Sequence, residues 1–224
     1  AKTERLVVAT GIANIYARDA AATAAAQKTL AEQSGGRFLL GLGVSHRPMV
    51  EGVRGHVYAS PVATMRAYLE RMEKAPYAAF PPAEAPPTVL AALGPKMLEL
   101  AATKTKGAHP YFTTPEHTAM ARKTMGPDAW LCVEQKVLLE TDPAKARNLA
   151  RLTAGIYLGL ENYRNNWKRL GFADSDFANG GSDRFIDATV AWGDVSVLQK
   201  RVRAHLDAGA SHVCIQPINP SGQP

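Results

Sequence analysis

Residues 88–98 have the sequence TVLAALGPKML, in which a short apolar run stops at Gly94 and Pro95 and passes directly into a helix-forming stretch. A continuous apolar run predicts a strand that is covered on both faces. Proline suits the first turn of a helix, where the backbone N–H groups have no partner within the helix. The junction therefore predicts a buried strand followed by a helix whose positive end can bind phosphate.

Outward from this junction, strand and helix signals alternate along the chain. Helix starts are indicated by Asp19 before an alanine-rich stretch, by Ser60 with Pro61, and by Thr114 with Pro115. Five further apolar runs predict strands, at residues 5–12, 37–44, 108–112, 129–139 and 212–218. Strict alternation of this kind predicts an α/β fold with a parallel sheet.

The choice between the two common parallel folds rests on the first run. It lacks the G-x-G-x-x-G fingerprint of a dinucleotide-binding strand, which favours a (β/α)₈ barrel over an open doubly wound sheet. Six predicted strands imply that the barrel is incomplete in this chain.

The segment 142–192 is the longest excursion from the strand and helix alternation. Its apolar residues recur at helical spacing and predict one helix face packed in the core or in a dimer, formed by Ile156, Leu160, Tyr163, Trp167 and Leu170. We expect this excursion to belong to a single domain over residues 1–224.

Composition narrows the class of protein. The chain has 224 residues, of which 46% are hydrophobic and 21% charged, which is typical of a globular protein. Its net charge of +6 is scattered among acidic residues, which argues against nucleic acid and favours a small anionic ligand or a solvated basic surface. No run is long enough to span a membrane, and residues 1–10 lack a signal-peptide layout, so we expect a cytoplasmic protein with no membrane contact.

Cysteine and histidine spacing adds two expectations. Cys132 and Cys214 lie in separate apolar runs, which predicts buried free thiols in a reducing compartment. The histidines show no spacing typical of a metal site, so no metal is predicted.

Five segments, taken in order, resemble the luciferase-like flavin and deazaflavin oxidoreductases, and most closely the actinobacterial branch that uses coenzyme F420. They are RLVVATGIANIYARD, RFLLGLGVSHRPM, LAALGPKMLELAA, GAHPYFTTPEHTAMAR and AWGDVSVLQKRVRAHLDAGASHVCIQP. The resemblance implies a (β/α)₈ barrel and a homodimer. By segment order, the first two βα units and most of the last helix of the family are missing here.

The resemblance also implies which residues contact the cofactor. In the family, the segment matching Gly11, Ile12, Ala13 and Asn14 forms a bulge behind the ring, often with a non-prolyl cis peptide. The segment matching Gly43, Val44 and Ser45 lies against the cofactor, and the one matching Gly94, Pro95, Lys96 and Met97 holds its phosphate. The alternative is that these segments bind no cofactor and form ordinary strand-to-helix turns, with the Lys96 side chain in solvent.

His46 is the candidate catalytic residue. It aligns with a position that holds a carboxylate base in the sugar-phosphate dehydrogenases of the family, and an imidazole can transfer a proton near neutral pH. The alternative is a loop histidine that binds phosphate or backbone. His109 is not predicted to belong to the site, because a histidine beside an apolar strand is more often a core residue.

The function implied by the resemblance is hydride transfer between coenzyme F420 and an unknown organic substrate. One alternative is a luciferase-like monooxygenase that uses FMN. The other is a non-catalytic flavin-binding protein, or a fragment that depends on another chain to cover its sheet.

Overall fold

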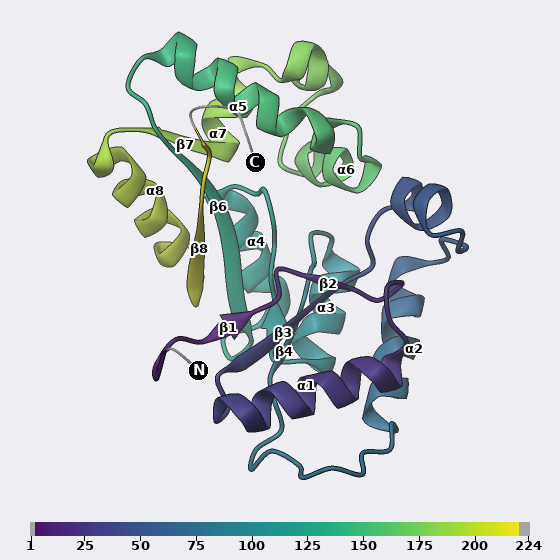
Figure 1. Ribbon diagram of the computed structural model, residues 1–224. Helices are drawn as coiled ribbons and strands as arrows, with labels where there is room; N and C mark the ends of the chain where they lie inside the picture. Colours follow the sequence, from purple (N-terminus) through teal and green to yellow (C-terminus); the bar gives the residue numbers. More distant parts are fainter. Residues whose placement is uncertain (1–2, 220–224) are drawn as a thin grey trace. The chain divides into compact units, whose positions relative to one another are not determined.

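The computed structural model describes residues 3–219, in which helices alternate with parallel strands (Figure 1). The chain forms two compact units. Unit 1 comprises Ala1–Ala92 and Lys96–His109, and unit 2 comprises Leu93–Pro95 and Pro110–Pro224. The parallel strands confirm the predicted α/β class.

Unit 1 is built around the buried strand β3. Its strands are β1 (Val8–Ala9), β2 (Ala13–Asn14), β3 (Phe38–Gly43), β4 (Thr88–Leu90) and β5 (Gly107–Ala108). Its helices are α1 (Ala20–Ser34), the π-helix η1 (Pro48–Val53), α2 (Pro61–Glu73) and, from its second residue on, α3 (Pro95–Lys104). β1, β2 and β4 each pair with β3 in parallel.

Helices α1 and α2 of unit 1 pack against each other beside this sheet (Figure 1). The Asp19 side chain accepts a hydrogen bond from Ala22 N–H and so caps α1, as its position predicted. The Thr23 and Tyr68 hydroxyls hydrogen-bond at 2.6 Å and join α1 to α2.

Unit 2 is built around the long strand β6 (Trp130–Leu139), which pairs in parallel with β7 (Val190–Gly193) and β8 (His212–Pro217). Its helices are α4 (Pro115–Met125), α5 (Pro143–Leu158), α6 (Glu161–Arg169), η2 (Asp174–Gly180), α7 (Asp183–Thr189) and α8 (Val195–Asp207).

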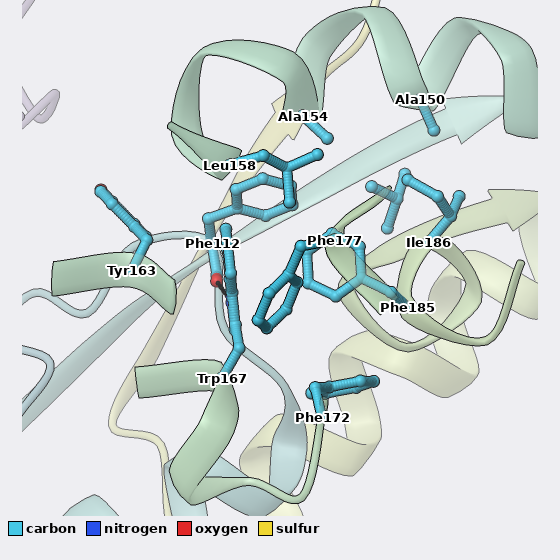
Figure 2. Close-up of a cluster of buried hydrophobic side chains, with 11 residues drawn as sticks. Phe112, Ala150, Ala154, Leu158, Tyr163, Trp167, Phe172, Phe177, Phe185 and Ile186 are labelled. Carbon is cyan, nitrogen blue, oxygen red and sulfur yellow. Dashed lines mark hydrogen bonds between the residues drawn. The ribbon is translucent and has the colours of Figure 1, made fainter. Parts of the chain in front are cut away.

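The aromatic core of unit 2 lies between α5, which carries Ala154 and Leu158, and α6, which carries Tyr163 and Trp167 (Figure 2). The rings of Trp167 and Phe185 are 4.7 Å apart and nearly perpendicular, a favourable arrangement for aromatic pairs. Trp167 also donates a hydrogen bond from its indole nitrogen to Phe112 O, at 3.1 Å. The ring contact joins α6 to α7, and the hydrogen bond joins α6 to the segment that precedes α4.

Three sequence-based expectations need correction. The predicted single apolar face is wrong, because the helix breaks at Gly159 and Leu160 and leaves Ile156 77% exposed. The buried side of α5 consists instead of Ala146, Ala150, Ala154 and Leu158. β7 was not predicted, and Cys214 is exposed while Cys132 is half-buried, although neither cysteine forms a disulfide within residues 3–219.

Among residues 3–219, no helix is both long and apolar enough to cross a membrane.

Candidate functional site

The first candidate segment is a β-bulge between β1 and β2. Ala9 pairs with Leu39 and Ala13 with Leu42, so the bulged strand has one more residue than β3 over this interval. The Thr10 hydroxyl bridges the gap, donating to Gly41 O at 2.8 Å and accepting from Gly41 N–H at 2.9 Å. The bulge implied by the resemblance is therefore present.

Within the bulge, the peptide bond between Gly11 and Ile12 is cis. Gly11 is exposed, whereas Ile12, Ala13 and Asn14 are half-buried. The Asn14 side chain accepts a hydrogen bond from Tyr16 N–H at 2.9 Å, so its oxygen stabilises the turn that follows β2.

The bulge and the end of β3 come together through one side chain. A Cβ added to Gly43 would lie 2.3 Å from Ile12 Cδ1, and one added to Gly41 would lie 2.2 Å from Thr10 O. Packing therefore requires glycine at both positions, because a side chain there would collide with Ile12 or with the backbone of the bulge. The contact with a cofactor that the resemblance implies is a second explanation for glycine at position 43.

The loop after β3 carries the next candidates, Val44, Ser45 and His46, all half-buried. Ser45 has a left-handed φ of 57°, which is uncommon for a residue other than glycine, and its carbonyl accepts a hydrogen bond from the Tyr58 hydroxyl. The His46 carbonyl accepts from Met49 N–H and Val50 N–H, both at 3.0 Å. Its backbone therefore anchors the start of η1.

His109 borders the same part of unit 1. A Cβ on Gly11 would lie 3.9 Å from His109 Nε2, so the ring faces the glycine of the bulge. The sequence predicts a core residue at this position, not a site residue. The position of His109 just after β5 could have identified it as a candidate site residue, because side chains at the carboxyl ends of parallel strands meet at one edge of the sheet.

The third candidate segment is the turn into α3, which begins at Pro95 as predicted. Lys96 is exposed, whereas Met97 is buried with 8% of its surface accessible. The side chain of Met97 therefore belongs to the core, and its backbone alone is left to contact a ligand.

Gly94, just before α3, has no structural requirement for glycine. Its φ is not left-handed, and an added Cβ would meet nothing nearer than the guanidinium of Arg169, at 3.7 Å. The missing side chain thus leaves space between the backbone and a cation, which fits a site for an anionic group. Sequence reasoning missed Arg169, because 75 positions separate it from Gly94.

His117 supports this turn from within unit 2. It is fully buried and donates a hydrogen bond from Nε2 to Leu93 O at 2.9 Å. Burial lowers the pKa of His117, and the positive charge of Arg169 lowers it further. The ring is therefore neutral near pH 7 and holds the residue that precedes Gly94.

The structure thus brings Gly11–Asn14 and Gly43–Ser45 together within unit 1, whereas Gly94 and Pro95 belong to unit 2. Over the part of the chain described, no group of three His, Cys, Asp or Glu side chains is arranged to hold a metal ion.

Comparison with known proteins relates this arrangement to known enzymes. A Mycobacterium tuberculosis (strain H37Rv) protein, whose name assigns it provisionally to the coenzyme F420-dependent oxidoreductases, is 25% identical over 276 residues. That match covers 95% of this chain and 79% of the relative.

Two solved structures share the fold. An F420-dependent secondary alcohol dehydrogenase with an F420-acetone adduct has a TM-score of 0.75 at 14% identity, covering 95% of this chain and 74% of that one. A type II Baeyer-Villiger monooxygenase from Pseudomonas putida, in complex with FMN, has a TM-score of 0.66 at 15% identity, covering 93% and 72%.

The (β/α)₈-barrel type predicted from the sequence, incomplete in this chain, is therefore confirmed. The prediction of an oxidoreductase related to the luciferases is confirmed as well. Because the family model of the luciferase-like monooxygenases matches residues 1–211, the chain belongs to the luciferase-like monooxygenase family.

Proposed function

We propose that this protein is an F420-dependent oxidoreductase that exchanges a hydride between the deazaflavin and an organic substrate. Membership of the luciferase-like family supports the class of enzyme, and the name of the M. tuberculosis relative supports the cofactor. The observation that carries the proposal is the open turn at Gly94, where a helix begins and a guanidinium faces a backbone without a side chain.

In this proposal, the residues before and within the first turn of α3 bind the phosphate of the cofactor. Gly94 and Pro95 bring the backbone close, the N–H groups of Lys96 and Met97 donate hydrogen bonds, and the helix dipole favours the negative charge. The exposed ammonium group of Lys96 adds a positive charge at the same end.

The ring-binding part of the proposal lies in unit 1. Gly11, Ile12, Ala13 and Asn14 support the ring from the bulge, and Gly43, Val44 and Ser45 contact it from the end of β3. The hydroxyl of Ser45 is available to donate a hydrogen bond to the ring. When bound, the deazaflavin supplies the hydride chemistry, while the protein orients both reactants.

His46 is the proposed proton-transferring residue, because its loop directly follows Ser45 and an imidazole is suited to accepting and donating a proton. A His46→Ala variant should keep its affinity for F420 and lose about a hundredfold in turnover, once a substrate is known. His212→Ala, which removes an exposed histidine on β8, is the control. An unchanged rate for His46→Ala would make the residue structural.

FMN is the competing cofactor, and the description of the matching family as monooxygenases favours it. The purified protein should be titrated with F420 and with FMN, and binding followed by ligand fluorescence. Tighter binding of F420 supports the proposal, and tighter binding of FMN overturns the choice of cofactor. Binding without hydride transfer would favour a non-catalytic flavin-binding protein.

A substitution at the turn tests the phosphate site directly. Gly94→Asp places a carboxylate where the phosphate is proposed to lie, so affinity should fall at least tenfold through charge repulsion. Gly155→Asp is the matched control, since an added side chain at Gly155 also meets no close neighbour but lies in α5. Equal affinities for both variants and wild type would remove the site.

A further inference from the structure

Arg169 is a cation without a counter-ion. It ends α6 and is exposed, and it makes no hydrogen bond or ion pair with residues 3–219. Its neighbours on α6 behave differently, because Arg164 and Lys168 both bind Asp174, at 2.5 and 2.8 Å. The guanidinium of Arg169 is thus available to an external anion.

The guanidinium of Arg169 lies next to the Gly94 turn. Both of its terminal nitrogens lie 3.7 Å from the place where Gly94 would carry a Cβ. It is also close enough to His117 for its charge to lower the pKa of that ring, and His117 holds Leu93 by a hydrogen bond of 2.9 Å. The guanidinium therefore faces a turn whose preceding residue, Leu93, is held by His117.

Asn166 provides an independent observation on the same helix. It is fully buried, and neither its amide nitrogen nor its amide oxygen has a hydrogen-bond partner in the described chain. Residues three positions apart lie on one side of a helix, so Asn166 projects from the same side of α6 as Arg169. Leaving a buried amide unpaired costs about 1–3 kcal/mol, which calls for an explanation such as a ligand.

We infer that Arg169 and Asn166 bind the phosphate group of the cofactor at the Gly94 turn, so that α6 contributes directly to cofactor binding. The inference rests on the proposed function, and it adds two residues that neither the sequence motifs nor the resemblance assigned. A guanidinium binds two phosphate oxygens at once, and an asparagine amide donates to one of the same two oxygens. The same chemistry serves a phosphate monoester and a phosphate diester.

The test compares two ligands that differ in the phosphate. Wild type and Arg169→Gln should be titrated with F420 and with the same deazaflavin lacking its phosphate and everything beyond it. Arg169→Gln should weaken F420 binding about ten- to a hundredfold and leave the phosphate-free ligand within twofold of wild type. Equal losses for the two ligands, or no loss, would overturn the inference.

Lys168→Gln is the matched control, because it removes the same charge from the adjacent position of α6 but breaks a surface ion pair with Asp174. Its affinity for F420 should stay within twofold of wild type. If Lys168→Gln loses as much affinity for F420 as Arg169→Gln, the loss reflects only the change in net charge, and the inference is overturned.

Asn166→Leu separates ligand binding from folding. Replacing an unpaired buried amide by an apolar side chain of similar size should maintain or raise the melting temperature. Affinity for F420 should nevertheless fall several-fold. A variant that melts as wild type does and binds F420 equally well would exclude Asn166 from the site.

Failure of the proposed function has a different signature. If wild type binds neither F420 nor FMN, inorganic phosphate becomes the probe. Phosphate should then raise the melting temperature of wild type and Lys168→Gln but leave that of Arg169→Gln unchanged. No stabilisation of wild type, or equal stabilisation of all three, would refute the anion site itself.

Discussion

At the scale of single residues, His205 shows how a buried hydrogen-bond network fixes a protonation state. Gln135 donates its amide to Lys136 O and Thr189 O, so its oxygen is left to accept from His205 Nε2, at 2.9 Å. The other ring nitrogen, Nδ1, lies 2.8 Å from the Thr118 hydroxyl and accepts from it. Both nitrogens are satisfied by the neutral ring.

This network predicts a loss of stability in acid. Burial lowers the pKa of His205 from 6.5 to about 4, and the charge of Arg201 adds to the effect. The unfolded chain takes up a proton below pH 6.5 and the folded chain does so near pH 4, so stability falls as the pH drops through this range. With about 1.4 kcal/mol for each pKa unit, the loss is about 3 kcal/mol.

Urea unfolding measured at pH 7.5, 5.5 and 4.5 checks this expectation. A His205→Gln variant should show a flatter dependence of unfolding free energy on pH, whatever its stability at pH 7.5. His212→Gln removes an exposed histidine and should keep the slope of wild type. Identical slopes for His205→Gln and wild type would disprove the assignment.

Residues that act locally were the ones that sequence could predict. The caps by Asp19 and Thr114 join groups three positions apart, so spacing alone identifies them. Gly94 was chosen on the same local grounds. Arg169 could not be found in this way, because its approach to Gly94 depends on how α6 packs in the folded protein.

At the scale of elements, β6 is a buried strand with an ion pair inside it. Glu134 and Lys136 are 2% and 1% exposed, and their side chains approach to 3.2 Å. Glu134 also accepts from Phe112 N–H at 2.8 Å, and the Lys136 ammonium lies 3.8 Å from the centre of the Tyr111 ring. Burial lowers the pKa of Lys136, although Glu134 opposes that change.

The pair predicts strongly coupled substitutions. Lys136→Met should destabilise the protein by about 3–5 kcal/mol, because it leaves the Glu134 carboxylate buried without its cation. The double variant with Glu134→Gln and Lys136→Met removes both charges, and its unfolding free energy should recover at least half of that loss. Chemical denaturation of the two variants and wild type measures the coupling. A double variant less stable than Lys136→Met would contradict it.

Elements were predicted where their signal lies within one segment. The run at 37–44 became β3, and the alanine-rich stretch became α1. β7 was missed because its four residues follow α7 directly and are defined by pairing with β6, about 54 positions away. The break at Gly159 was missed because apolar spacing continues across it.

At the scale of the whole molecule, the question is whether the two units unfold together. Each has a core of its own, with Leu42 and Met65 fully buried in unit 1 and Trp167 and Phe185 in unit 2. We nevertheless propose that residues 1–224 form one cooperative domain, because the family resemblance treats both units as parts of one barrel.

The tryptophans provide the measurement. All three, Trp130, Trp167 and Trp192, belong to unit 2, so their fluorescence reports on that unit, whereas far-UV circular dichroism also detects α1 and α2 of unit 1. In a single cooperative domain, urea unfolding followed by the two signals should give coincident curves.

A substitution in unit 1 makes the test sharper. Met65→Ala opens a cavity at a fully buried position of α2 and should cost about 2–5 kcal/mol. If unfolding is cooperative, this loss must move the fluorescence midpoint of the unit 2 tryptophans by the same amount as the dichroism midpoint. Thr64→Ala changes the adjacent, half-buried residue and should move both midpoints little. A dichroism midpoint that falls while the fluorescence midpoint stays fixed would mean that the two units are separate domains.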